Sequence, residues 1–95
     1  MRNQPLSQAE IDERAAALSG WTVADGKLRA TFEFDSFASA FGWMTKVALV
    51  AEKLDHHPDW KNVYNRVEVE LFSHDIGALS ENDFRLAAEM TRLAG

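Results

Sequence analysis

The chain has 95 residues, 46% of them hydrophobic and 26% charged, which is the composition of one folded domain rather than of a disordered chain. Its net charge of −5 and the absence of any run of Lys or Arg argue against nucleic acid or an anionic membrane as a direct partner. The absence of cysteine excludes disulfides and thiol catalysis. No apolar run reaches the ~20 residues of a membrane span. We therefore expect a cytoplasmic protein with one domain over residues 1–95.

A capping box predicts that the first helix runs from about Gln8 to Leu18. The hydroxyl of Ser7 can accept a hydrogen bond from the amide of Glu10, while the Glu10 side chain reaches back to the Ser7 amide. This reciprocal pair is typical of a helix N-terminus.

Two strands joined by a tight turn are expected next, over residues 21–24 and 27–34. Asp25-Gly26 between the two runs is a strong hairpin signal. In the second run apolar and polar residues alternate, which indicates a strand with one buried face. The alternating apolar residues are Leu28, Ala30, Phe32 and Phe34.

The longest predicted element is a helix that begins after a cap at Asp35 or Ser36 and leads the chain to His56. One face of this helix carries Phe37, Phe41, Met44, Ala48 and Ala51. A second set widens that face and consists of Trp43, Val47, Val50 and Leu54. A helix with so wide an apolar surface is expected to be buried on more than one side, by its own sheet and by another subunit.

Two further strands and a last helix complete the predicted elements. The strands cover residues 61–65 and 66–72 with Asn65 in the turn, and residues 73–78 form a loop. Asp83 repeats the capping-box pattern with Ser80, so we assign it to capping and to no chemical role. The last helix covers residues 81–93 and presents Phe84, Ala87, Ala88 and Met90.

The order α-β-β-α-β-β-α contains two hairpins and none of the strand–helix alternation that builds parallel sheets. It predicts an α+β two-layer sandwich, in which three helices lie on one face of a four-stranded antiparallel sheet.

All three histidines of the chain lie near one another in sequence, at His56, His57 and His74. Histidine can give and take protons near neutral pH, so this concentration indicates an acid/base site. Pro58 disfavours a helical conformation for His57, which is therefore expected to be extended where the preceding helix ends.

Several carboxylates near the histidines could raise an imidazole pKa, fix a tautomer or hold a substrate NH group. Glu52 precedes His56 by four residues and would share its face if the helix continued that far, although a solvated surface pair is an equal alternative. The other carboxylates are Asp55, Asp59 and Asp75, for which bonding to backbone amides is the competing interpretation.

Two further residues complete the candidate site. Trp60 could stack on a planar ring, and it could equally belong to the core. Ser73 could bond to a substrate, but no arrangement typical of a serine nucleophile surrounds it. A zinc site is the rival hypothesis for the histidines, and it is disfavoured because adjacent residues of an extended chain point to opposite sides.

The chain resembles pterin-4a-carbinolamine dehydratases in four blocks of sequence. These blocks are 41–48, 51–60 with the pattern Glu-x-x-x-His-His-Pro-Asp-Trp, 62–65, and Ser73-His74-Asp75. The resemblance covers nearly the whole chain and is weakest over the first ~30 residues. It implies dehydration of a 4a-hydroxytetrahydropterin to the quinonoid dihydropterin, which recycles the pterin cofactor of aromatic amino-acid hydroxylases. It further implies that His56, His57 and His74 are the catalytic residues. His56 and His74 would form the acid/base pair, and His57 would hold the pterin ring and share in proton transfer.

The resemblance also implies that no metal, nucleophile or redox cofactor is needed, and that the protein is a homodimer or homotetramer. The alternative function is a non-catalytic interaction module, because some animal members of the family act as dimerisation cofactors of a transcription factor. The acid/base residues favour the enzyme, with a small pterin as the partner and no direct contact with nucleic acid or membrane.

Overall fold

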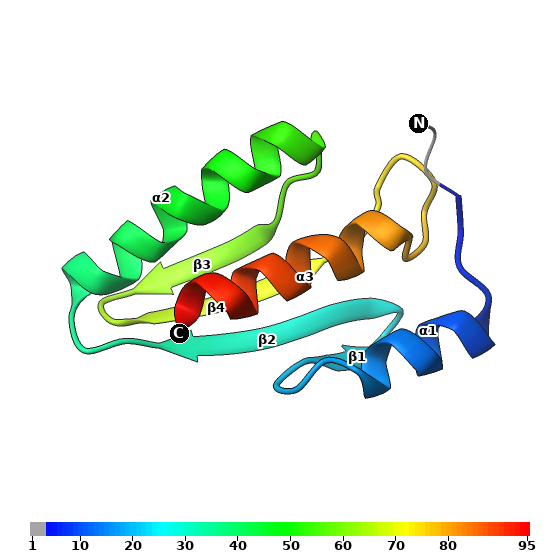
Figure 1. Ribbon diagram of the computed structural model, residues 1–95, viewed down its shortest axis with the longest axis horizontal. Coiled ribbons are helices and arrows are strands. Elements are labelled where there is room, and N and C mark those ends of the chain that lie inside the picture. The colour runs from blue at the N-terminus through cyan, green and yellow to red at the C-terminus, as the bar shows by residue number, and fades with distance from the viewer. Residues whose placement is uncertain (1–3) are drawn as a thin grey trace.

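A computed structural model describes residues 4–95 and confirms the predicted order of three helices and four antiparallel strands (Figure 1). The first three residues of the expected domain lie outside the described residues. The elements are α1 (Gln8–Ala16), β1 (Thr22–Ala24), β2 (Lys27–Glu33), α2 (Phe37–Leu54), β3 (Asp59–Val63), β4 (Arg66–Leu71) and α3 (Glu81–Ala94).

The sheet has the strand order β1-β2-β4-β3, so the two hairpins meet along β2 and β4. The predicted Asp-Gly hairpin is confirmed: Asp25 and Gly26 have φ of 55° and 75°, the left-handed values that a tight two-residue turn requires. The capping box of Ser7 and Glu10 at the start of α1 is also confirmed.

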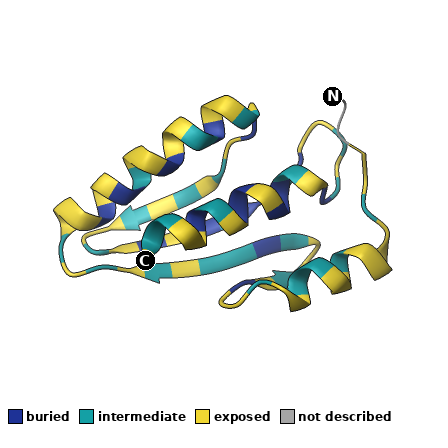
Figure 2. Ribbon diagram, viewed as in Figure 1, coloured by how far each residue is buried: buried dark blue, intermediate teal, exposed yellow. Residues whose placement is uncertain are grey.

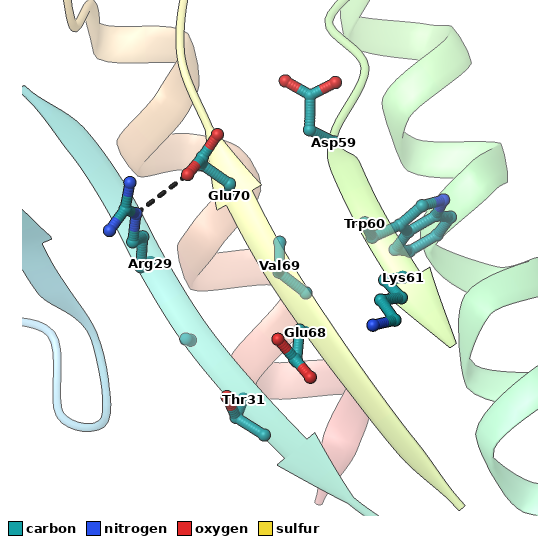
Figure 3. A pocket seen from close by; sticks show the side chains of 9 residues that line it. Arg29, Thr31, Asp59, Trp60, Lys61, Glu68, Val69 and Glu70 are labelled. Atoms are coloured by element: carbon teal, nitrogen blue, oxygen red, sulfur yellow. Dashed lines mark hydrogen bonds and ion pairs between the residues drawn. The ribbon is translucent and has the colours of Figure 1, made fainter. Parts of the chain in front are cut away.

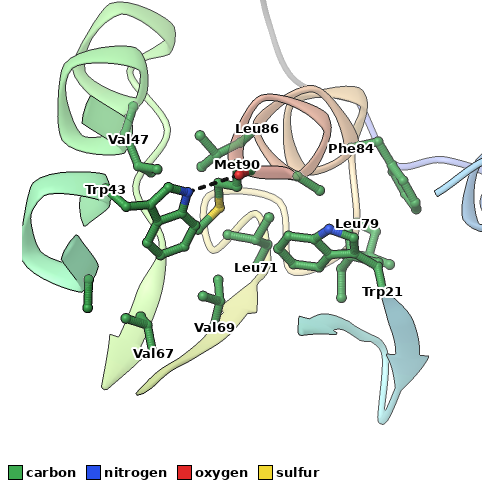
Figure 4. Close-up of a cluster of buried hydrophobic side chains, with 14 residues drawn as sticks. Trp21, Trp43, Val47, Val67, Val69, Leu71, Leu79, Phe84, Leu86 and Met90 are labelled. Carbon is green, nitrogen blue, oxygen red and sulfur yellow. Dashed lines mark hydrogen bonds between the residues drawn. The ribbon is translucent and has the colours of Figure 1, made fainter. Parts of the chain in front are cut away.

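The helices α2 and α3 lie over one face of the sheet, and α1 lies beside β1 (Figure 1). The core lies between the helices and the sheet. It contains Leu28 of β2 and the buried apolar residues of β4, α2 and α3 (Figure 4). The buried indole of Trp43 donates a hydrogen bond from Nε1 to the carbonyl of Met90 at 3.0 Å, which ties α2 to α3. Of the apolar residues expected on α3, Ala88 is exposed and Leu86 takes its place in the core.

The core covers only part of the wide apolar surface that was expected on α2. The buried stripe is Ala40, Trp43, Val47 and Ala51, and the exposed fractions of Phe37 and Phe41 are 49% and 54%. Ala48 is exposed too, and Leu49 is 71% exposed. The large indole of Trp43 packs against the sheet, which turns the phenylalanine stripe outward, where Figure 2 shows exposed residues along the outer side of α2.

The second face of the sheet carries polar side chains. Along β4 the residues alternate between the core face, with Val67 and Val69, and the polar face, with Glu68 and Glu70. Within residues 4–95 no helix is both long enough and apolar enough to cross a membrane.

Candidate functional site

The histidine pair lies just after α2, where a sharp turn ends the helix. Asp55 caps the helix with φ 52° and ψ 45°, and the amide of His56 donates to the carbonyl of Ala51 at 3.0 Å. This is the hydrogen-bond pattern of a left-handed helix C-cap, in a residue type that tolerates the conformation better than most. The turn sends His56 into the protein and leaves His57 outside.

His56 is buried, with 6% of its surface exposed, and its Nε2 lies 2.5 Å from Oδ1 of Asp83. Asp83 is fully buried in the first turn of α3. Its predicted capping role is confirmed, because Oδ2 accepts a hydrogen bond from the Ser80 amide at 2.9 Å. Capping is therefore only one of its contacts, and the carboxylate also joins the end of α2 to the start of α3.

Two buried serines complete the surroundings of Asp83. The hydroxyl of Ser73 donates to Oδ2 of Asp83 at 2.8 Å and lies 2.6 Å from the hydroxyl of Ser80. Since the Ser73 proton is directed to the carboxylate, Ser80 is the donor in the serine pair. Both oxygens of this buried carboxylate therefore have hydrogen-bond partners. Ser73, expected to contact substrate, is 1% exposed and is committed to this network.

The surroundings of His56 raise its pKa above the ordinary value. The hydrogen bond to Asp83 is the largest cause, burial of the ring opposes it, and the charges of Asp83, Asp75 and Asp55 add to the rise. The imidazole is therefore held toward its protonated form, the form that can act as a general acid.

His57 pairs with Glu52 on the surface. Its Nε2 lies 2.7 Å from Oε1 of Glu52, and the two side chains are 56% and 78% exposed. A shared helical face for Glu52 and His56 depended on the helix continuing to His56, and α2 ends at Leu54. The early end of the helix rotates His56 away and brings His57 to the carboxylate.

His74 pairs with Asp59, the first residue of β3. Its Nε2 lies 3.1 Å from Oδ2 of Asp59, and the ring of Phe72 meets the imidazole edge-on with centroids 5.2 Å apart. His74 lies in the loop after β4, which a bridge between Ser73 and Ala78 closes.

The two remaining predicted residues have different places. Trp60 turns its ring into the core, where it lies 6.1 Å from the ring of Trp43. Asp75 is exposed, and its charge acts on the pKa of His56. Asp75 is thus near the site, whereas the Trp60 ring supports the sheet from inside.

The common feature of the site is that each histidine has a carboxylate partner of its own. The three pairs are His56–Asp83, His57–Glu52 and His74–Asp59. They come from the end of α2, the start of β3, the loop after β4 and the start of α3. The pairing of Asp59 with Glu70 brings the start of β3 beside the end of β4, so the pairs lie at one end of the sheet. Within residues 4–95, no three His, Asp or Glu side chains form a group that could hold a metal ion.

Asp83 is the site residue that sequence reasoning missed. Its position three residues after Ser80 explains the cap completely, and nothing in the local pattern points to a histidine 27 residues earlier. Only the packing of α3 against the end of α2 brings the two side chains together.

Comparisons with known proteins find similar sequences over nearly the whole chain. The family model described as pterin 4 alpha carbinolamine dehydratase matches residues 4–93. A protein of Jannaschia sp. (strain CCS1), provisionally named pterin-4-alpha-carbinolamine dehydratase, is 58% identical over 96% of this chain and 97% of its own length. A protein of the same provisional name from Rhizobium etli is 45% identical over 99% of this chain and 95% of its own length.

A solved structure has the same fold. The crystal structure of a transcriptional coactivator/pterin dehydratase from Brucella melitensis superimposes with a TM-score of 0.93 at 42% sequence identity. The match covers 97% of this chain and all of the other.

Proposed function

The chain belongs to the pterin 4 alpha carbinolamine dehydratase family, and from this premise we propose that it dehydrates a 4a-hydroxytetrahydropterin to the quinonoid dihydropterin in the cytoplasm. The observation that carries the proposal is the set of three histidine–carboxylate pairs at one end of the sheet. The reaction breaks the C4a–O bond and forms a double bond between C4a and N5. It needs an acid for the leaving oxygen and a base for the N5 proton.

His56 is the proposed acid. Its raised pKa favours the imidazolium, and Nε2 is committed to Asp83, so Nδ1 is the nitrogen left to give a proton to the C4a hydroxyl. The hydroxyl then leaves as water while the N5 lone pair forms the new bond. Asp83 is a positioning residue, because it fixes the ring orientation and favours its charge.

His74 is the proposed base. Asp59 accepts from its Nε2, which leaves Nδ1 to take the N5 proton, and the carboxylate stabilises the imidazolium that forms. Such acid and base steps are each worth about 10²–10⁴-fold in rate. Neither step requires a metal or a redox cofactor, so treatment with a chelator should leave turnover unchanged.

The remaining site residues are proposed to bind the substrate. His57 and Glu52 are exposed and can offer a donor and an acceptor to the polar edge of a pterin ring. Asp55 and Asp75 contribute negative charge at the entrance, which supports the protonated state of His56.

We also propose that the protein is a homodimer or homotetramer. The outer side of α2 exposes Phe37, Phe41 and Leu49, an apolar surface of a kind that soluble monomers rarely leave uncovered. A second copy of α2 would cover it with matching apolar residues.

The experiment for the reaction is an ultraviolet assay of hydroxypterin decay with single and double histidine variants. His56→Ala and His74→Ala should each lower kcat by about 10²-fold or more, and His57→Ala should mainly raise KM. The double variant of His56 and His74 should lose less than the product of the single losses if the two act as one unit. Full activity in His74→Ala would remove it from the site.

The second candidate function is a binding role, which the name of the Brucella protein suggests through the words transcriptional coactivator. The exposed face of α2 would be the docking surface. A pull-down that recovers a protein partner through this face, together with no turnover of the hydroxypterin, would favour the binding role over the enzyme.

A further inference from the structure

An aromatic side chain lies among charged groups at the end of the polar face of the sheet. This face carries a depression of about 430 Å³, lined by side chains of β2, β3 and β4 (Figure 3). At the end near His74, Arg29 donates to Glu70 at 2.8 Å, drawn as a dashed line in Figure 3, and Asp59 pairs with Glu70 across the strands. Side chains two positions apart in an extended chain share a face, so the next residue on this face after Glu70 is Phe72. Its ring lies beyond the depression, next to the proposed base.

Lys27 holds the Phe72 ring from the neighbouring strand. The register pairs Leu28 with Leu71, and one step further along it Lys27 comes opposite Phe72. The Lys27 ammonium lies 5.6 Å from the centroid of the Phe72 ring, inside the roughly 6 Å range of a cation–π contact. The same ammonium pairs with Oε1 of Glu70 at 3.3 Å. The cation over the ring is therefore itself fixed by a carboxylate.

The Phe72 ring in turn contacts the imidazole of His74. The two ring centroids are 5.2 Å apart and the planes meet at 73°, the edge-to-face geometry that aromatic pairs prefer. The His74 side chain is 65% exposed, and its Nε2 lies 3.1 Å from Oδ2 of Asp59. That hydrogen bond fixes Nε2 but leaves the ring free to turn about the contact. The Phe72 ring restricts this turn, and so sets the direction in which Nδ1 of His74 points.

We propose that Phe72, held in place by Lys27, is a positioning residue for His74. This inference rests on the proposed function, in which Nδ1 of His74 takes the N5 proton. A base must lie within hydrogen-bond reach of the proton that it removes, so a rotated imidazole transfers the proton more slowly. The substrate is bound by other groups, so the effect of Phe72 should fall on kcat and not on KM.

The kinetic test replaces the ring and the cation separately and together. Phe72→Leu keeps an apolar side chain without the ring, and should lower kcat about three- to tenfold at unchanged KM. Phe72→Tyr keeps the ring and should retain the kcat of wild type. Lys27→Met keeps the length of the side chain without its charge, and should lower kcat by less than Phe72→Leu does. The double variant should match Phe72→Leu alone, because Lys27 acts through the ring.

The matched control is Phe34→Leu. It makes the same change to another half-buried ring, which packs 5.2 Å from the ring of Trp43 and lies beside Asn65 at the far end of the sheet. Phe34→Leu should lower the stability of the fold and leave kcat unchanged. A kcat that Phe72→Leu does not alter, that Phe34→Leu lowers equally, or that Phe72→Tyr fails to restore would overturn the positioning role.

NMR spectra of the free protein separate this inference from the proposed function. The ring current of Phe72 acts on the carbon-bound ring protons of His74, so Phe72→Leu should change their frequencies. It should change those of His57 much less, because that imidazole pairs with Glu52 instead. If wild type does not turn over the hydroxypterin, the dehydratase proposal fails, and a change confined to His74 would still support the contact. Unchanged His74 frequencies in Phe72→Leu would refute it.

Discussion

At the scale of single residues, the protein places three histidines in three different environments. His56 is buried and pairs with a fully buried carboxylate, whereas His57 and His74 pair with exposed carboxylates. These three residues could be proposed as a site from the sequence alone, because few side chains titrate near neutrality. It could not assign their partners, since the link between His56 and Asp83 depends on how two helices pack.

Replacing Asp83 by Asn should lower kcat by about 10–100-fold and change the pH dependence of the rate. Asn keeps the shape of Asp but carries no charge, so the main cause of the raised His56 pKa disappears. Because His56 must be protonated to act as the acid, the loss of activity with rising pH should begin at a lower pH. The measurement is a pH profile of kcat/KM.

Asp75→Asn is the matched control, because it removes a smaller influence on the pKa of the same imidazole. Its profile should move in the same direction by less. An alkaline limb that stays in place in Asp83→Asn would show that His56 is not the acid.

The stability of the protein should also depend on His56 and pH. A pKa that is raised on folding contributes stability that is complete below about pH 6.5, the unfolded value, and is lost as the pH rises through the folded value. The free energy of unfolding of wild type minus that of His56→Asn should therefore decrease as the pH rises. Urea unfolding of both proteins between pH 5 and pH 9 measures this, and a difference that grows with pH would contradict it.

At the scale of elements, the patterns in the sequence predicted where helices and strands form but not how α2 is rotated. Hydrophobic period, capping boxes and the Asp-Gly turn are local signals, and the order of helices and strands, the cap of α1 and the turn were confirmed. The buried face of α2 is decided by the fit of Trp43 among Phe32, Phe34 and Trp60, which come from other parts of the chain. For the same reason, the local pattern did not show where α2 ends or that Glu52 pairs with His57.

The turn after α2 should become more stable when Asp55 is replaced by Gly. Asp55 has φ 52°, a conformation that glycine adopts without a steric penalty. We expect the free energy of unfolding to rise by about 0.5–1 kcal/mol in Asp55→Gly and to fall in Asp55→Ala. Chemical denaturation of the three proteins is the measurement, and a less stable Gly variant would mean that the aspartate side chain holds the turn.

At the scale of the whole molecule, the exposed phenylalanines of α2 predict assembly. In the variant with Phe37→Ser and Phe41→Ser, sedimentation should show a folded monomer at micromolar concentration, whereas wild type should be a dimer or tetramer. Both residues are about half exposed, so the core should tolerate the changes. Tyr64→Ser removes a similarly exposed ring at a hairpin tip and should leave the assembly intact. A wild-type monomer would contradict the prediction.

The strand order also bears on how the chain folds. Each hairpin closes over two residues, but the join between β2 and β4 brings together residues as far apart as Lys27 and Glu70, whose side chains form an ion pair across 43 positions of the chain. Loop-closure entropy must be overcome before such a pairing contributes free energy. We therefore expect the docking of one preformed hairpin on the other, across the length of α2, to set the folding rate. Since Arg29 and Thr31 come from one hairpin and Asp59, Lys61 and Glu68 from the other, the depression on the polar face would exist only once this slow step is complete.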